Sequence, residues 1–331
     1  MTGHELPLAM TMGDPAGIGP ELALAAWRDR TPGAPFFVLA APAVLAAASR
    51  RVGFEARIIE TDPASAARKF SEGLPVVPLA HAVEAEPGRP SAANAPATIE
   101  SIKRAVEAVH RGEARAMVTN PIAKAVLYEA GFRFPGHTEY LGELAKAWGA
   151  PAFPVMMIWS SALAVVPVTI HIPLAEAPRA LSAELIVRTA RVVDRDLRAR
   201  FGVARPRLAF AGLNPHAGEG GAMGREEITI IAPAIEALRA EGIEAAGPLS
   251  ADTMFHSKAR ARYDVALTMY HDQGLIPVKT LAFDEGVNVT LGLPFVRTSP
   301  DHGTAFDIAG KGLANPASLI AAIKLADRLT R

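Results

Sequence analysis

The sequence contains no cysteine, and that absence removes several kinds of site at once. Disulfide bonds, thiolate zinc sites, iron–sulfur clusters and a cysteine nucleophile are all excluded. Any metal ion must therefore be held by histidine and carboxylate side chains. The formal net charge is zero, because 34 lysines and arginines balance 34 aspartates and glutamates. Without a basic field to attract a polyanion, we expect no nucleic-acid partner.

Long hydrophobic runs are missing as well. The two most apolar stretches, 36–48 and 155–168, are interrupted by proline or serine. Both fall short of the roughly 18 apolar residues that a membrane span needs. Near the N-terminus, His4 and Glu5 stand where a signal peptide would have a basic start and an apolar stretch. We therefore predict a cytoplasmic protein with no membrane partner.

The chain is long enough for two lobes, because its 331 residues exceed the roughly 250–300 at which single cores stop growing. Short β-rich runs alternate with Ala- and Leu-rich amphipathic stretches, which is typical of βα units around a mostly parallel sheet. Strands are predicted at 6–12, 116–119, 163–169, 207–211 and 265–270, and helices at 20–28 and 121–128. The last three strands are apolar on both faces, so we expect them inside a sheet. The predicted fold class is α/β.

Three histidines follow three of these predicted strands. His171 comes after the strand that ends at 169, His216 after the one that ends at 211, and His271 after the one that ends at 270. Ligands of open parallel sheets bind beyond the carboxyl ends of the strands, so the three imidazoles can converge. Three such ligands suit a catalytic divalent metal with open positions. Taken singly, each histidine is better explained as a solvated loop residue, and their spacing matches no local zinc motif.

Two regions offer groups for an anion. Lys279, Asn288 and Arg297 fall within one predicted βα neighbourhood, and a lysine with an arginine suits a small phosphorylated ligand. The alternative is that both cations are surface residues. The segment 136–139 brings a threonine hydroxyl to a helix start, where backbone N–H groups favour an anion. A helix cap explains Thr138 almost as well.

The glycine-rich loops do not fit a standard nucleotide motif. The loops at 13–19 and 218–224 both fail the Gly-x-Gly-x-x-Gly spacing, because Leu22 and Met223 occupy the last glycine position. No Gly-Lys-Ser/Thr sequence occurs either. Glycine in these loops is explained by positive φ and close backbone approach.

Six segments resemble one family in its own order along the chain. They are Met-Gly-Asp-Pro-Ala-Gly-Ile-Gly-Pro-Glu at 12–21, Thr-Asn-Pro at 119–121, Gly-His-Thr-Glu at 136–139, His-Ile-Pro-Leu at 171–174, Leu-Asn-Pro-His-Ala-Gly-Glu at 213–219 and Tyr-His-Asp-Gln-Gly at 270–274. Together they resemble the 4-hydroxythreonine-4-phosphate dehydrogenase family of pyridoxal phosphate biosynthesis. The resemblance covers nearly the whole chain.

That resemblance implies a two-lobed α/β/α fold like that of isocitrate and isopropylmalate dehydrogenases, with an active-site cleft between the lobes. The nucleotide-side lobe is expected at 1–130 plus 290–331, and the metal, substrate and dimerisation lobe at 131–289. A homodimer is implied, with a metal site shared across the interface. The family's metal ligands fall on His171, His216 and His271, the last from the partner subunit. Its substrate contacts fall on His137, Thr138, Lys279, Asn288 and Arg297.

A further segment, 301–316, is similar to the adenosine-binding loop of isopropylmalate dehydrogenases, with Phe306 where that family has proline. By this similarity Asp307 accepts hydrogen bonds from the ribose hydroxyls, and its charge opposes a 2′-phosphate. NAD is therefore favoured, although the family uses NADP too. Asp252 and Asp272 are candidates for supporting a metal ligand or relaying a proton, or are simply exposed loop carboxylates. Three imidazoles accept zinc or cobalt, and magnesium less naturally.

The implied reaction oxidises the secondary alcohol of 4-phosphooxy-L-threonine with NAD and then decarboxylates the product. Relatives of the family oxidise other four-carbon substrates, such as D-threonate or D-erythronate 4-phosphate, and the motifs do not separate these. A metal-dependent phosphohydrolase would use the same histidines and phosphate contacts without a nucleotide. A noncatalytic phosphometabolite-binding protein would bind the ligand without turnover.

Overall fold

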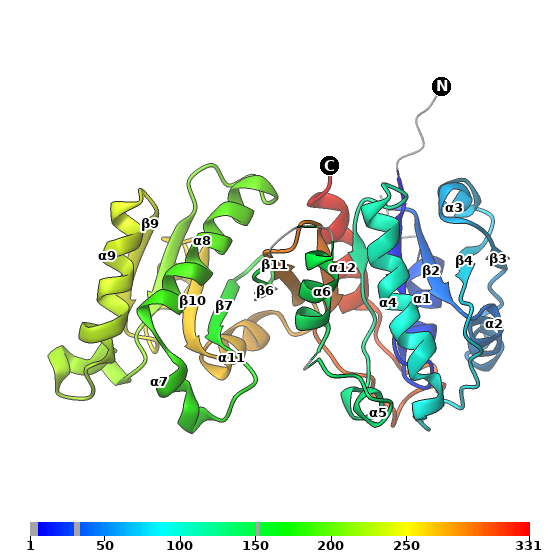
Figure 1. Ribbon diagram of the computed structural model, residues 1–331, viewed down its shortest axis with the longest axis horizontal. Coiled ribbons are helices and arrows are strands. Elements are labelled where there is room, and N and C mark those ends of the chain that lie inside the picture. The colour runs from blue at the N-terminus through cyan, green and yellow to red at the C-terminus, as the bar shows by residue number, and fades with distance from the viewer. Residues whose placement is uncertain (1–5, 30–33, 135, 148, 150–151) are drawn as a thin grey trace. The chain divides into compact units, whose positions relative to one another are not determined.

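The computed structural model describes residues 6–29, 34–134, 136–147, 149 and 152–331 (Figure 1). His4 and Glu5 lie outside the described residues. The chain divides into two compact units. Unit 1 joins Met1–Ala152 to Leu293–Arg331, and unit 2 is the continuous segment Phe153–Gly292. Unit 1 is thus built from two segments that are far apart in the sequence.

The described strands of unit 1 form parallel pairs. Their order is β3 (Ile58–Glu60), β4 (Leu74–Pro78), β2 (Phe36–Ala40), β1 (Leu8–Thr11), β5 (Met117–Val118) and β12 (Arg297–Pro300). In register, Met117 of β5 lies opposite Ala9 of β1 on one side and Arg297 of β12 on the other. The C-terminal segment therefore adds its strand directly to the sheet built by the N-terminal segment.

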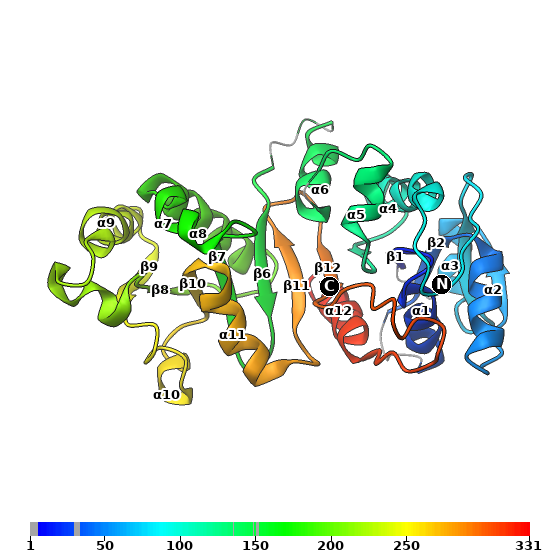
Figure 2. The same cartoon turned by 90° about the horizontal axis from the view of Figure 1, so that it is seen from below.

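Unit 1 also contains helices. They are α1 (Gly19–Arg28), α2 (Pro42–Arg51), α3 (Pro63–Lys69), α4 (Ala95–His110), α5 (Lys124–Glu129), α6 (His137–Lys146) and α12 (Ala317–Arg328), with a 3₁₀ turn at Ala92–Asn94. Proline in the first turn of α1 to α4 supplies a preset φ where no N–H partner is needed. Helix α4 packs on β1 and β2, and α12 packs on β12 and β5 (Figure 2). One hydrophobic core of this unit includes Phe37, Ile102, Leu141 and Phe295.

Unit 2 has a mixed sheet. Its order is β11 (Val287–Leu291), β6 (Val155–Trp159), β7 (Ala164–Thr169), β10 (Val265–Tyr270), β8 (Arg207–Ala211) and β9 (Glu244–Leu249). β7, β10, β8 and β9 are parallel neighbours, whereas β6 pairs antiparallel with both β7 and β11. The parallel part brings the carboxyl ends of β7 and β10 to the same edge.

Helices cover this second sheet as well. They are α7 (Ala177–Ala180), α8 (Ala183–Ala199), α9 (Ala232–Ala240), α10 (Ser257–Arg260) and α11 (His271–Ala282), together with 3₁₀ segments at Leu174–Glu176 and Pro215–Gly221 and a π-helical turn at Glu227–Ile231. Helix α8 begins where the Ser182 hydroxyl accepts the Leu185 N–H at 3.1 Å. Helices α8 and α11 both pack on β7. Buried Ile158, Val165 and Val278 belong to the core of this unit.

The structure confirms the α/β fold class and the predicted elements. The strands expected at 207–211 and 265–270 have those bounds, and each lies between two neighbouring strands. The strand expected at 6–12 is shortened to Leu8–Thr11, and the helix expected from 121 begins at Lys124. Across the described residues, no helix combines the length and the apolar character needed to span a bilayer.

Candidate active site

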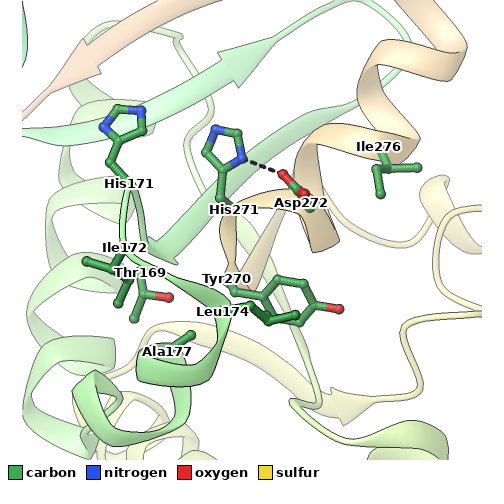
Figure 3. Close-up of a pocket in the computed structure, with 9 residues that line it drawn as sticks. All are labelled: Thr169, His171, Ile172, Leu174, Ala177, Tyr270, His271, Asp272 and Ile276. Carbon is green, nitrogen blue, oxygen red and sulfur yellow. Dashed lines mark hydrogen bonds and ion pairs between the residues drawn. The ribbon is translucent and has the colours of Figure 1, made fainter.

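Two of the three predicted metal ligands meet in unit 2. His171 follows β7, and His271 follows β10 directly as the first residue of α11. Because β7 and β10 are paired in parallel, their carboxyl ends deliver the two imidazoles side by side, with ring centres 5.6 Å apart (Figure 3). Both rings line a cavity of about 420 Å³. Its other lining residues are Thr169, Ile172, Leu174, Ala177, Tyr270, Asp272 and Ile276.

An aspartate orients one of these rings. The Nδ1 atom of His271 lies 2.7 Å from Oδ1 of Asp272, and Figure 3 shows this contact as a dashed line. A carboxylate that accepts the Nδ1 proton fixes the tautomer, so that Nε2 keeps its lone pair for a metal ion. The side chain of His271 is 34% exposed and that of Asp272 is 71% exposed. The pair is therefore reachable from solvent.

Both His171 and His216 have a left-handed backbone, with φ of 52° and 51°. Residues other than glycine rarely adopt this conformation, which costs energy and tends to occur at functional sites. His216 opens a run of left-handed residues that continues through Gly220 and includes Ala217 and Glu219. Such a run persists only if the surrounding structure holds it in place.

The carboxylate of Glu227 supplies that support. Glu227 is 3% exposed and accepts the Asn214 backbone N–H at 2.7 Å and its side-chain amide at 3.0 Å. The same amide also donates to Glu226 at 2.7 Å. A β-carbon at Gly218 would lie only 2.5 Å from the Glu227 carboxylate. Glycine at 218 therefore lets the turn close onto its anchor.

The donors at this site fit a borderline divalent metal. Neutral imidazoles are the preferred protein ligands of zinc and cobalt, and a carboxylate behind one of them is the usual supporting contact. Within the described parts of one chain, His171 and His271 come together, but no group of three His, Asp or Glu side chains is close enough to hold an ion. His216 does not join the other two within one chain.

A second cluster forms in unit 1 around Arg297, the first residue of β12. Arg297 is 3% exposed, and its guanidinium donates to the Thr119 hydroxyl oxygen through Nε at 3.1 Å and Nη2 at 2.6 Å. Burial lowers the pKa of Arg297 to about 10. The group is still charged at neutral pH, so unit 1 holds a buried cation.

His137 lies beside this arginine at the start of α6. Burial, and then the positive charges of Arg297 and Lys124, lower the pKa of His137 well below its usual range. The imidazole is therefore neutral, and its Nε2 atom is shielded from solvent without a hydrogen-bond partner among the described residues. Helix α6 begins at His137 with Gly136 as its N-cap. Thr138 is thus not the cap, and the capping explanation of this threonine is wrong.

The remaining predicted residues fall in both units. Lys279 lies on α11, with its ammonium 5.9 Å from the Phe283 ring centre. Asn288 lies on β11, where its Oδ1 atom is buried without a partner among the described residues. Asp252 is exposed and accepts the Ser250 hydroxyl at 2.6 Å. Asp307 is exposed on a turn of unit 1.

The segment that carries Asp307 packs on the first glycine-rich loop. The Ile18 N–H donates to the Thr304 carbonyl at 3.0 Å, and a β-carbon at Gly17 would lie 2.9 Å from that same oxygen. Farther along, the Gly310 N–H donates to the Glu21 carboxylate at 3.2 Å. The loops at 13–19 and 301–316 are therefore in contact in the folded chain, which the sequence alone does not predict.

Sequence analysis missed two functional candidates. The role of Glu227 has no clear local signal, because its relation to His216 depends on how the intervening turn closes. Lys124 has no sequence signal of its own, because its approach to the start of α6 depends on the fold. The available signal for Glu227 was an acidic residue close behind the predicted ligand loop.

The fold and the paired histidines define an α/β protein with two imidazoles at the carboxyl ends of parallel strands, where ligands of such sheets bind. Within that class the assignment is specific. The model of the pyridoxal phosphate biosynthetic protein PdxA family matches residues 33–326, and the chain belongs to this family.

Individual relatives are similar to this chain along its full length. The 4-hydroxythreonine-4-phosphate dehydrogenase of Methylorubrum populi is 59% identical over 100% of this chain and 96% of its own length. The crystal structure of the enzyme of that name from Klebsiella pneumoniae has a TM-score of 0.86 and 38% identity, covering 99% of this chain and 100% of its own. A terephthalate 1,2-cis-dihydrodiol dehydrogenase from Burkholderia xenovorans has a TM-score of 0.65 and 29% identity, covering 98% of each chain. The fold therefore also carries a dehydrogenase named for a different substrate.

Proposed function

We propose that this chain is an NAD-dependent and divalent-metal-dependent 4-hydroxythreonine-4-phosphate dehydrogenase of pyridoxine 5′-phosphate biosynthesis. The observation that carries the proposal is its 59% identity, over its full length, to a relative with that name. The substrate, 4-phosphooxy-L-threonine, would lose a hydride from its secondary alcohol to NAD and the hydroxyl proton to a base. The resulting 2-amino-3-oxo-4-phosphooxybutanoate would then lose carbon dioxide to give 3-amino-2-oxopropyl phosphate.

His171 and His216, with the His271 of a second copy, are the side chains that would hold the metal ion. When bound, such an ion lowers the pKa of a substrate hydroxyl and polarises the ketone as charge develops during decarboxylation. Zinc or cobalt suits these imidazoles better than magnesium does. Asp272 keeps the Nδ1 proton of His271 engaged, which leaves Nε2 directed to the ligand.

The substrate would be positioned by polar groups of both units. Arg297, His137 and Thr138 form the cluster in unit 1, and Lys279 and Asn288 lie in unit 2. Charge-assisted contacts to the anionic ends of the substrate orient the reacting carbon toward the nicotinamide. Asp252 and Asp272 are the proposed candidates for relaying the hydroxyl proton, because both are exposed carboxylates of unit 2.

Asp307 would bind the cofactor. Its carboxylate is exposed on the segment that packs against the first glycine-rich loop, and it would accept hydrogen bonds from the ribose hydroxyls. A 2′-phosphate would be repelled by the same charge, so NAD is proposed ahead of NADP.

Association into a homodimer is supported by apolar side chains near the histidine cavity. Leu174 and Ile276, which line this cavity, are 67% and 65% exposed. Phe283, the C-cap residue of α11 in the same unit, is 74% exposed. Exposed apolar side chains of this size, gathered on one unit, are typical of a protein interface. A second copy seated there would lie beside the imidazoles, as a shared metal site requires.

The test of the function is NADH formation from NAD and 4-phosphooxy-L-threonine, with and without a chelator. Parallel reactions with D-threonate and D-erythronate 4-phosphates separate the substrates. Turnover that depends on the metal and is confined to 4-phosphooxy-L-threonine is expected. Turnover only with the sugar acids would move the enzyme to another substrate, and phosphate release without NADH would indicate a hydrolase.

A further inference from the structure

Lys124 lies at the start of helix α6 although it belongs to another helix. It is the first residue of α5. A β-carbon built on Gly136, the N-cap of α6, would lie 3.4 Å from Cε of Lys124 and 3.5 Å from its Nζ. The ammonium group is therefore next to the first turn of α6, which carries His137 and Thr138.

The surroundings of the Lys124 ammonium group do not stabilise its positive charge in the free protein. Among the described residues, no carboxylate forms an ion pair with Lys124 within 4.0 Å. The nearest acidic group on α6 is Glu139, whose Oε2 atom would lie 3.6 Å from the same built β-carbon. The unpaired N–H groups of a helix start also repel a cation. An anion placed between the ammonium and these N–H groups would remove that repulsion.

The charges around His137 define which anion fits. Lys124 and Arg297 are both positive, and both act on the His137 imidazole, which is itself neutral. The cluster thus presents two positive charges. A phosphate monoester carries about −1.5 to −2 at neutral pH, whereas a carboxylate carries only one negative charge. The charge of the phosphate matches that of these two cations, with the Glu139 carboxylate as the opposing charge nearby.

The chemistry of the two cations is complementary. An arginine fork held by Thr119 offers fixed N–H directions, and a lysine offers a mobile point charge that can follow the third phosphate oxygen. The shielded Nε2 atom of His137 adds a polar group that has no partner among the described residues. All four side chains belong to unit 1.

We propose that Lys124 is a further substrate-binding residue and that it binds the phosphate group together with Arg297 and the first turn of α6. This inference rests on the proposed function, which supplies a phosphorylated substrate. It adds a residue that the family resemblance did not assign.

The test measures binding of inorganic phosphate to the purified protein, by ³¹P NMR titration without substrate or NAD. Lys124→Gln is expected to weaken phosphate binding about tenfold, as loss of one charge-assisted contact does. Lys124→Arg should keep most of the affinity, because the charge remains. With substrate, Lys124→Gln should raise KM much more than it lowers kcat. The side chain is exposed, so the thermal midpoint should not move.

Two control variants of α6 make the result specific. Lys146→Gln removes a lysine at the other end of the same helix, where it pairs with Glu143 at 2.9 Å, and should bind phosphate like the wild type. Glu139→Gln should leave the affinity equal or higher, because it removes a negative charge near the bound anion. Unchanged phosphate binding in Lys124→Gln, or an equal loss in Glu139→Gln, overturns the proposal. Weakened binding in Lys124→Gln alone, in a protein without dehydrogenase turnover, would retain the phosphate contact and reject the proposed function.

Discussion

His271 and Asp272 are neighbours in sequence, and their side chains also meet, with Nδ1 2.7 Å from Oδ1. The pair stands on the first two residues of α11. A carboxylate there interacts favourably with the positive end of the helix dipole while it orients the imidazole. One aspartate thus stabilises the start of the helix and orients the imidazole of His271.

Asp272→Asn should weaken metal binding about tenfold, because loss of a carboxylate behind a ligand histidine has effects of that size. The measurement is a cobalt titration followed by the visible absorption of the bound ion. Asp194→Asn is the matched control, since Asp194 pairs with Arg198 at 2.8 Å on a helix of the same unit. Equal cobalt affinity in wild type and Asp272→Asn would contradict the orienting role.

Gly218→Ala should destabilise the protein strongly and also weaken cobalt binding through His216. The new β-carbon would meet the Glu227 carboxylate at 2.5 Å, on a backbone with φ of +81°. We expect a loss of about 3 kcal/mol in the free energy of unfolding, measured in urea. Gly202→Ala has a similar φ of +71° but nothing within 4 Å, and should cost only about 1 kcal/mol. Similar losses in the two variants would show that Glu227 is not the anchor.

Glu100 should make stability depend on acid pH. Partial burial raises its pKa, but hydrogen bonds from the Ala80 and His81 N–H groups, the His81 ring and Arg104 outweigh this and lower the pKa to about 2. A lowered pKa stabilises the folded state above the unfolded value of 4.5, and this contribution is lost as pH falls toward 2. Glu100→Gln should therefore cost about 2 kcal/mol at pH 7 and less at pH 3. Urea unfolding at both pH values checks this; a difference independent of pH would exclude the carboxylate as its source.

Asp307→Asn should raise the KM for NAD about tenfold, roughly 1.4 kcal/mol of lost binding, and leave the KM for the phosphorylated substrate nearly unchanged. Removal of the charge should also improve the use of NADP relative to NAD, because a 2′-phosphate is no longer repelled. Steady-state kinetics with both cofactors gives the two comparisons. An effect confined to the substrate KM would move Asp307 out of the cofactor site.

Ile276→Lys should dissociate the proposed dimer, because it places a charge on an apolar surface that a second copy would cover. Light scattering after size exclusion measures the mass. Leu313→Lys is the control: Leu313 is 67% exposed, close to the 65% of Ile276, but belongs to unit 1. A monomeric wild type, or an unchanged mass in Ile276→Lys, would count against this interface.

The pairing of His171 with His271 could be anticipated from the sequence because it depends on strand ends. Apolar runs define β7 and β10, and parallel pairing then places the residues after them at one edge. The turn around His216 could not be anticipated in the same way. Its glycines predicted positive φ, and Gly218 and Gly220 have it. That Ala217 and Glu219 share this conformation depends on the Glu227 anchor, which is a contact at longer range.

The cluster around Arg297 was still harder to foresee. Arg297, His137 and Lys124 meet only because β12 pairs with β5 and because α5 and α6 begin beside each other. No local pattern encodes either event. From sequence alone, a threonine near a helix start is a candidate N-cap. The structure shows that the N-cap of α6 is Gly136.

The division of unit 1 into two segments sets an order of assembly during synthesis. Unit 2 is continuous and leaves the ribosome complete, whereas Leu293–Arg331 emerges after it. Until then β5 lacks its neighbour β12 and remains an open strand edge of its unit. The Thr119 hydroxyl likewise lacks the hydrogen bonds from the guanidinium of Arg297 until that segment has been synthesised. The nascent chain therefore carries its histidine pair well before the cluster around Arg297 can form, and premature termination before 293 leaves the first without the second.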